Sequence, residues 1–243
     1  MAEQFPDMLL GAGTVLTTEQ ADRAIAAGAK FIVSPGFNPK VVSHCIEKNI
    51  PITPGISSPS DMEQAIEMGL DAVKFFPAVP SGGLSMIKAL AAPYHTMRFM
   101  PTGGVTPQNL TEFLDYPKIL ACGGTWMAKP ELLATGNFEE ITRLTRQTVR
   151  TMLDLKIDEL TLPFPHTGNN LADALHGLIN LSSGSTKELT ISCRYLKRTI
   201  YHLEKNGATF RYDNAKYDSA GNMDAIDFSD APEEFSIRLI EKH

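Results

Sequence analysis

A lysine within an apolar strand pattern is the residue of this sequence with the clearest chemical potential. Lys74 lies in Ala72–Pro77, where strand alternation places Val73 and Phe75 on one face and Lys74 and Phe76 on the other. If Val73 and Phe75 face a helix layer, Lys74 points into the interior, where desolvation disfavours its ammonium form. A neutral amine can attack a ketone and form a Schiff base. The alternative is a lysine whose stem packs in the strand while its charge reaches solvent.

Two glycine pairs follow the next two strand patterns, within Thr102–Gly104 and Gly123–Thr125. Glycine lets backbone N–H groups approach an anion closely, and a helix start predicted at Thr106 would add its positive end. A single pair is usually only a turn, whereas two pairs at equivalent strand ends indicate a phosphate site. Together with a carbonyl-directed Lys74, the glycine pairs indicate a phosphorylated keto compound as the ligand.

These residues belong to a repeating pattern of short apolar runs and helical segments between Leu9 and Met152. The runs recur about every 20 residues, which is the length of a βα unit. Continuous apolar strands followed by amphipathic helices predict a parallel sheet covered by helices, and Gly or Pro after nearly every strand favours a (β/α) barrel. A dinucleotide-binding fold is disfavoured because Gly11–Leu16 lacks the third glycine of its phosphate loop. The runs are 9–16, 31–34, 50–53, 72–76, 98–101 and 119–122, and helix starts are predicted at Thr17 or Thr18, Asn38, Ser58, Thr106 and Asn137.

After Thr151 the pattern changes, and we place a domain boundary between residues 152 and 153. The order strand, helix and three strands predicts a small α+β module with an antiparallel sheet over residues 153–243. The predicted strands are 155–162, 188–193, 208–212, 222–228 and 235–241, with a helix at 195–206 and a short helix candidate at 171–181.

Composition excludes several classes of protein. The 243 residues are 43% hydrophobic, enough for a sizeable core, and the net charge of 22 − 28 = −6 disfavours a nucleic-acid binder. No apolar run approaches the ~18 residues of a membrane span, and no signal peptide is apparent, so we expect a cytoplasmic protein. The three cysteines, Cys45, Cys122 and Cys193, lack the spacing of a zinc site and predict reduced thiols.

Six short segments, in this order and spacing, resemble the class I 2-keto-3-deoxy-6-phosphogluconate (KDPG) and 4-hydroxy-2-oxoglutarate (KHG) aldolases over residues 4–150. The resemblance implies a TIM barrel, a homotrimer, and a Schiff-base lyase of the Entner–Doudoroff pathway that needs no metal or cofactor. Its substrate would be KDPG, cleaved to pyruvate and glyceraldehyde 3-phosphate, or KHG, cleaved to pyruvate and glyoxylate. The preference between the two stays open. The segments are Gly11–Leu16, Phe31–Gly36, Pro54–Ser57, Lys74–Ala78, Pro101–Val105 and Gly123–Trp126.

The resemblance also implies roles for individual residues. Lys74 falls on the imine-forming lysine, and Phe76 on the aromatic residue beside it. Thr14 and Pro35 fall on residues that line the pyruvyl end of the pocket. The phosphate-side turns of the family match Thr102, Gly103, Gly104 and Gly124, and Thr125 stands where the family often has serine.

Two residues of the family have no counterpart in this sequence: a general acid/base Glu on the second barrel strand and an Arg that binds the substrate carboxylate. Residues 1–10 resemble the end of the second helix, so we expect that Met1 is an internal methionine of a longer aldolase. The barrel would then hold six of eight βα units, and turnover would be small or absent. Glu3 matches the helix tail, while Glu19 and Asp61 lie at predicted helix starts, where capping explains them better.

Residues 188–242 resemble a glyoxalase-type (vicinal oxygen chelate, VOC) βαβββ module, which would hold a metal through His and Glu on strands. His202 lies in a predicted helix and His166 in a Pro-rich loop, which leaves Glu241 as the positional candidate. A single carboxylate is not a metal site, so a regulatory, packing or oligomerisation role is favoured. Three hypotheses remain: a Schiff-base aldolase or its remnant, a non-catalytic phosphate-ligand-binding or regulatory protein, and a metal-dependent VOC-type enzyme. The expected partners are a small phosphorylated keto acid and pyruvate, with no nucleic acid or membrane.

Overall fold

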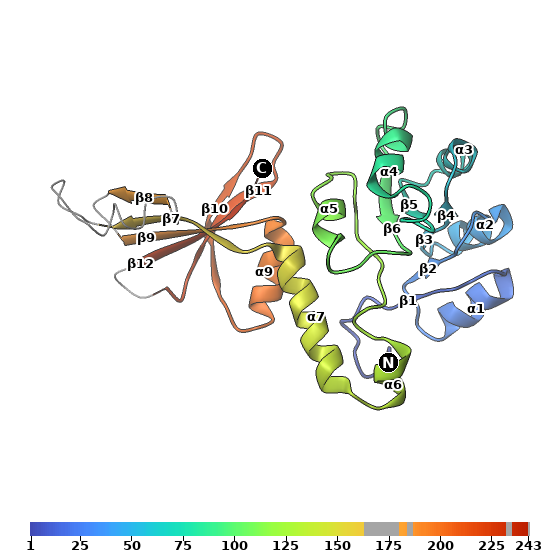
Figure 1. Cartoon of the computed structure of the whole chain (residues 1–243), viewed down its shortest axis with the longest axis horizontal. Helices are drawn as coiled ribbons and strands as arrows, with labels where there is room; N and C mark the ends of the chain where they lie inside the picture. Colours follow the sequence, from blue (N-terminus) through green and yellow to red (C-terminus); the bar gives the residue numbers. More distant parts are fainter. Residues whose placement is uncertain (163–179, 184–186, 232–234, 243) are drawn as a thin grey trace. The chain divides into compact units, whose positions relative to one another are not determined.

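The computed structural model describes residues 1–162, 180–183, 187–231 and 235–242. The chain divides into two compact units, Met1–Leu144 and Thr145–His243 (Figure 1). The boundary falls within one long helix, α7 (Phe138–Leu153). No helix among the described residues combines the length and hydrophobicity needed to cross a membrane.

The first unit alternates short strands with helices, as the sequence pattern predicted. Neighbouring strands pair in parallel and in chain order, β1-β2-β3 and β4-β5-β6, and helices α1 to α4 lie along one side of them (Figure 1). The elements are β1 (Gly11–Ala12), α1 (Thr18–Ala26), β2 (Phe31–Val33), α2 (Pro39–Glu47), β3 (Ile52–Thr53), β4 (Gly55–Ile56), α3 (Pro59–Glu67), β5 (Ala72–Phe75), α4 (Gly83–Ala91), β6 (Arg98–Pro101), α5 (Leu110–Leu114) and α6 (Pro130–Ala134).

Three predicted runs differ in detail from the observed strands. Run 9–16 is reduced to the two residues of β1, and run 119–122 contributes only an isolated parallel bridge from Ile119 to Phe99. The third run ends at Thr53, and a further strand, β4, begins after Pro54. Proline has no N–H group to donate to a ladder, so it interrupts regular pairing at this point.

The two faces of these strands differ in burial. Ile32 and Ile52 belong to a core with residues of α1 and α2 and are 0% and 6% exposed. Their neighbours Val33 and Thr53 point to the other face because strand residues alternate, and both are only half-buried. The helix-covered face is therefore a packed core, whereas the opposite face stays partly accessible.

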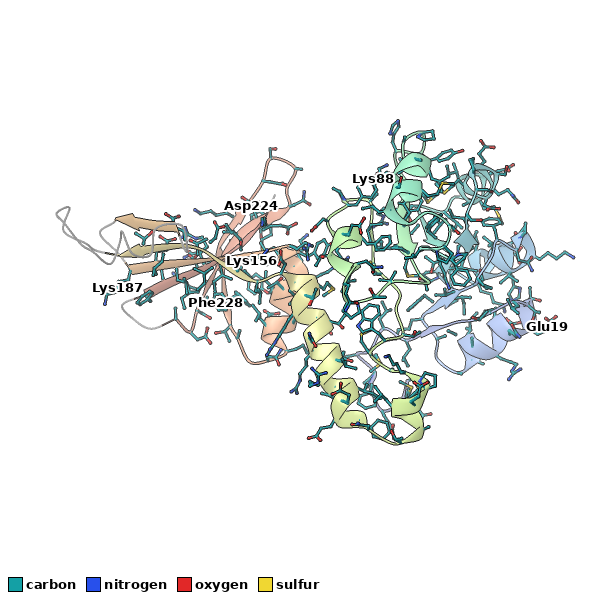
Figure 2. The ribbon with its side chains drawn as sticks, in the orientation of Figure 1. Glu19, Lys88, Lys156, Lys187, Asp224 and Phe228 are labelled. Carbon is teal, nitrogen blue, oxygen red and sulfur yellow. The ribbon has the colours of Figure 1, made fainter. Side chains whose placement is uncertain are left out.

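Most helix starts lie where the capping residues predicted them. Thr17 accepts a hydrogen bond from Gln20 N, and Asn38 accepts one from Lys40 N. Ser58 forms a capping box with Asp61, and Glu19 lies in the first turn of α1 (Figure 2). These contacts explain the carboxylates of Asp61 and Glu19 as helix-start residues.

The prediction of a helix start at Thr106 is wrong, because α5 begins at Leu110. The Asn109 side chain accepts a hydrogen bond from Thr106 N at 2.8 Å and donates one to Gly104 O at 3.0 Å. These side-chain bonds close a turn where a helical turn was expected, since Asn competes for local backbone groups.

The second unit is a six-stranded sheet in the order β10-β11-β12-β9-β7-β8, and helix α9 packs against β11 and β12. The predicted antiparallel sheet is wrong in part, because β12 pairs with β9 in parallel, as β7 does with β8. Helix α9 connects β9 to β10, and β10 runs in the same direction as β9. The chain then reverses between β10 and β11 and again between β11 and β12, so β12 also runs in the direction of β9. The elements are β7 (Lys156–Leu162), β8 (Asn180–Ser183), β9 (Lys187–Cys193), α9 (Leu196–Glu204), β10 (Phe210–Tyr217), β11 (Met223–Phe228) and β12 (Phe235–Glu241). The helix candidate 171–181 lies outside the described residues, except for its last two, which belong to β8.

Candidate active site

Lys74 lies in β5 with its side chain on the face that the helices do not cover. Its register partner is Gly55, which follows Thr53 by two residues and so shares its face. Val73 and Phe75, on either side in the sequence, are 0% exposed. The predicted alternation of this strand is therefore confirmed.

The environment of Lys74 favours a neutral amine. The residue is 8% exposed, and burial lowers the pKa of its ammonium group because desolvation penalises the charged form. Its Nζ lies 4.5 Å from the centroid of the Phe76 ring, whose negative face attracts a cation and partly opposes that shift. Among the described residues no carboxylate influences the Lys74 pKa.

The loops that follow β5 and β6 are bound to one another beside Lys74. Ala78 N donates to Thr102 O at 2.8 Å, and Val79 N donates to Gly103 O at 3.0 Å. A Cβ built on Gly103 would lie 3.2 Å from the Phe76 ring. Thr102, Gly103 and Phe76 are thus assembled in one place by the ends of adjacent strands, as the barrel pattern predicts for site residues.

The two glycine pairs present backbone N–H groups. Gly103 and Gly104 have φ values of +94° and +84°, a conformation that only glycine adopts readily. Within the described part of the chain, no hydrogen bond uses the N–H groups of Gly103, Gly104, Gly124 or Thr125. A parallel bridge between Thr102 and Gly123 brings the two pairs together. The arrangement can therefore receive an anion, although α5 does not contribute the expected helix end.

Thr14, Pro35 and Thr125 are less closely tied to Lys74. Pro35 is half-buried and follows β2, and its carbonyl oxygen packs against Gly55, the register partner of Lys74. Thr14 is exposed beyond the end of β1, and no described contact links its side chain to Lys74. Thr125 is also exposed, after the second glycine pair.

Sequence reasoning missed two residues that shape this region, Ser34 and Gly55. Ser34 is 3% exposed, and its Oγ donates to Gly36 O at 2.9 Å. Gly55 is buried against the loop that contains Pro35. A polar residue ending an apolar run and a glycine directly after Pro54 were the available signals, but neither identifies its contact partner.

The metal candidate of the second unit has a structural role. Glu241 Oε2 accepts a hydrogen bond from Leu196 N at 2.7 Å, at the start of α9, where Tyr195 provides no side-chain cap. His202 lies on α9 as predicted, and His166 lies outside the described residues. In the described ranges no three His, Cys, Asp or Glu side chains cluster as metal ligands.

The start of α9 also borders a cavity of about 420 Å³. Lys197 and Arg198 line it from the helix. Asp224, which is labelled in Figure 2, lines it from β11. Asp218 and Glu241 contribute further carboxylates.

Comparison with known proteins places these features in context. The family of KDPG and KHG aldolases matches residues 1–144. The 2-dehydro-3-deoxy-phosphogluconate aldolase of Treponema pallidum is 53% identical over 148 residues, which are 61% of this chain and 70% of that protein. Its counterpart from Haemophilus influenzae is 51% identical over 144 residues, covering 59% of this chain and 68% of that protein.

Solved structures give the same result. The KDPG aldolase of Legionella pneumophila, with pyruvate captured as a covalent carbinolamine intermediate, is 36% identical with a TM-score of 0.58, covering 62% of this chain and 70% of that one. The 2-keto-3-deoxy-6-phosphogluconate aldolase of Zymomonas mobilis ZM4, solved with 3-phosphoglycerate, is 36% identical with a TM-score of 0.55. The matched region is 60% of this chain and 68% of the Zymomonas mobilis chain.

Proposed function

Since the chain belongs to the KDPG and KHG aldolase family, a family of lyases, we propose that Lys74 forms a Schiff base with a 2-oxo acid and supports aldol cleavage. The proposed substrates are KDPG, split into pyruvate and glyceraldehyde 3-phosphate, and KHG, split into pyruvate and glyoxylate. The observation that carries this proposal is the buried lysine whose pKa is lowered by desolvation, at the end of a parallel strand. The carbinolamine captured in the Legionella pneumophila relative supports it.

In the proposed reaction, the neutral Lys74 amine attacks the C2 ketone and water leaves, which gives a protonated imine. The imine withdraws electrons as the C3–C4 bond breaks and the aldehyde departs. The resulting enamine takes a proton, and hydrolysis releases pyruvate and the free amine. The Phe76 ring, 4.5 Å from Nζ, is suited to stabilise the cationic imine.

We assign the phosphate of the substrate to the glycine pairs. The N–H groups of Gly103, Gly104, Gly124 and Thr125 have no partner within the described residues, so they are available to phosphate oxygens. The Thr125 hydroxyl keeps the donor of the serine that is common there in the family. The 3-phosphoglycerate bound by the Zymomonas mobilis relative supports a phosphate-bearing ligand.

Proton transfer is the step that we propose to limit turnover in this chain. Every stage of the reaction moves a proton, so an acid/base group within reach is required. No carboxylate of the described residues influences Lys74, and the family's Glu and Arg have no match in the sequence. We therefore propose that these 243 residues by themselves form the Schiff base but release pyruvate slowly.

Borohydride trapping tests the proposal. The full chain is mixed with pyruvate and sodium borohydride, and the modified peptide is identified by mass spectrometry. We expect labelling on Lys74, because reduction fixes the imine as a stable secondary amine. Lys74→Arg keeps the charge but cannot form the imine, so it loses the label, while Lys40→Arg at an exposed position retains it.

The outcomes separate the candidate functions. Trapping that a chelator does not change contradicts a metal-dependent VOC-type reaction. Absence of trapping, with retained binding of 3-phosphoglycerate, would leave a phosphate-ligand-binding protein without Schiff-base chemistry. Pyruvate release from KDPG at rates near those of intact relatives would contradict the proposed limit on turnover.

We also propose that residues 153–243 form a module outside the catalytic machinery, and that the chain is a homo-oligomer, a trimer by analogy with its family. Light scattering of the purified chain measures its mass directly. A monomer at micromolar concentration contradicts the proposed assembly.

A further inference from the structure

We propose that Gly55 and Ser34 are positioning residues that hold the loop Pro35–Gly36 as one wall of the keto-acid pocket beside Lys74. The inference rests on the proposed function. It adds two residues that act through the loop, Ser34 by its hydroxyl group and Gly55 by its lack of a side chain. It also explains why the register partner of the reactive lysine is a glycine.

The contact between Gly55 and the loop leaves no room for a side chain. A Cβ built on Gly55 would lie 2.0 Å from Pro35 O, 2.3 Å from Pro35 C and 2.8 Å from Gly36 N. These atoms are backbone, so no side-chain rotation relieves the overlap. Glycine is therefore needed for the close approach of two backbone segments.

The loop, rather than the strand, would move if Gly55 acquired a side chain. Two backbone hydrogen bonds hold the residues on either side of Gly55. Lys74 N donates to Pro54 O at 2.9 Å, and Phe76 N donates to Ile56 O at 3.2 Å. Gly55 is buried within this pairing, whereas Gly36 is exposed. A methyl group at position 55 would thus displace Pro35 and leave Lys74 in its strand.

Ser34 holds the other side of the same loop. Its backbone N–H donates to Thr53 O at 3.5 Å, and its Oγ donates to Gly36 O at 2.9 Å. The side chain is almost fully buried at 3% exposure, so the hydroxyl depends on this partner to satisfy its hydrogen-bonding capacity. The loop is therefore pinned by a hydroxyl on one side and by van der Waals contact with Gly55 on the other.

This arrangement gives the pocket a rigid backbone wall. Lys74 shares a strand face with Gly55, and the Phe76 ring lies 4.5 Å from its Nζ. A 2-oxo acid bound to Lys74 would lie between that ring and the loop. Displacing the loop should weaken the binding of the keto acid before imine formation. The reactivity of the amine should be unchanged, because the loop acts only by holding the keto acid in position against Lys74.

The test measures borohydride trapping in the full chain as a function of pyruvate concentration. Gly55→Ala and Ser34→Ala are compared with Ser219→Ala, a control that makes the same Ser-to-Ala change at an exposed position of the second unit, outside the pocket wall. We expect the half-saturating pyruvate concentration to rise about tenfold in Gly55→Ala and about two- to tenfold in Ser34→Ala, as for one lost hydrogen bond. Ser219→Ala should match the unsubstituted chain. The yield of trapping at saturating pyruvate should be the same in the three variants and the unsubstituted chain. The rate at which a small amine-reactive reagent labels Lys74 should also be the same in all four proteins.

The possible failures are distinguishable. No trapping in the unsubstituted chain overturns the proposed function and this inference with it. Trapping in the unsubstituted chain together with an unchanged half-saturation in folded Gly55→Ala overturns this inference alone. If circular dichroism finds Gly55→Ala unfolded, Ser34→Ala decides, and an unchanged half-saturation there overturns the inference. A lower saturating yield or altered Lys74 labelling would indicate general structural damage and would also overturn it.

Discussion

At the scale of single residues, the chemistry of this chain depends on how burial and an aromatic ring act on one amine. Burial opposes the charge on Lys74, while the face of Phe76 favours it. A nucleophilic amine must be neutral, but the imine that it forms is a cation. In the proposed reaction, the two influences therefore serve different stages.

The lowered pKa predicts how Lys74 labelling depends on pH. A lower pKa leaves a larger neutral fraction of the amine at any pH below the ordinary lysine range. Competitive labelling with acetic anhydride should therefore give Lys74 its half-maximal rate at a lower pH than N-acetyl-lysine amide in the same mixture. Quantitative peptide mapping from pH 6 to pH 11 measures both curves. Coincident curves would show that the amine is not desolvated.

At the scale of elements, long-range side chains complete helix ends that the local sequence leaves open. Arg194 donates from its guanidinium to Thr151 O and Met152 O, both at 3.1 Å, and its backbone N–H donates to Leu153 O. These carbonyls belong to the last turn of α7, where a cation is also favoured by the helix dipole. Glu241 serves the start of α9 in the same way.

Replacing Arg194 should destabilise the second unit. Arg194→Met removes charge-assisted hydrogen bonds to carbonyls that are then left without a donor, so we expect a loss of about 1.5–3 kcal/mol in the free energy of unfolding. Arg143→Met is the control, because solvent screens the exposed Arg143–Glu140 pair of the same helix, so its loss should change the free energy of unfolding much less. Urea unfolding of both variants, followed by circular dichroism, gives the comparison. Equal losses would contradict the capping role.

At the scale of the whole molecule, the two compact units meet within α7 and not at its end. The predicted break between residues 152 and 153 would separate Arg194 from Thr151 and Met152. A division of the chain at the end of a helix ignores the contacts that satisfy that end. The second unit therefore includes the last turns of α7.

Fragments that start on either side of α7 test this division. Residues 138–243 retain the whole helix and the carbonyls that Arg194 binds, whereas residues 155–243 lose them. We expect the longer fragment to unfold cooperatively with the higher Tm and the shorter fragment to be less stable. Differential scanning calorimetry of both fragments measures the difference. A shorter fragment of equal or greater Tm would mean that α7 contributes nothing to the second unit.

Local signals in the sequence were sufficient for much of the first unit. Parallel strands in chain order, helix caps at Thr17, Asn38 and Ser58, and the alternation around Lys74 all follow from residues only a few positions apart. The start of α5 was missed because the side chain of Asn109 bonds backward to Gly104 and Thr106. Propensity and capping rules do not resolve such competition between two local bonding patterns.

The sequence by itself therefore determined the family and located Lys74 and the glycine pairs, because each is encoded in a short segment. Only the tertiary structure decided which distant groups meet them. Three contacts join segments that are far apart in the chain: the close approach of Gly55 to the Pro35 backbone, the hydrogen bond from Leu196 N to Glu241, and the parallel pairing of β12 with β9. Such contacts depend on strand register and on the packing of whole elements, so no spacing of residue types specifies them.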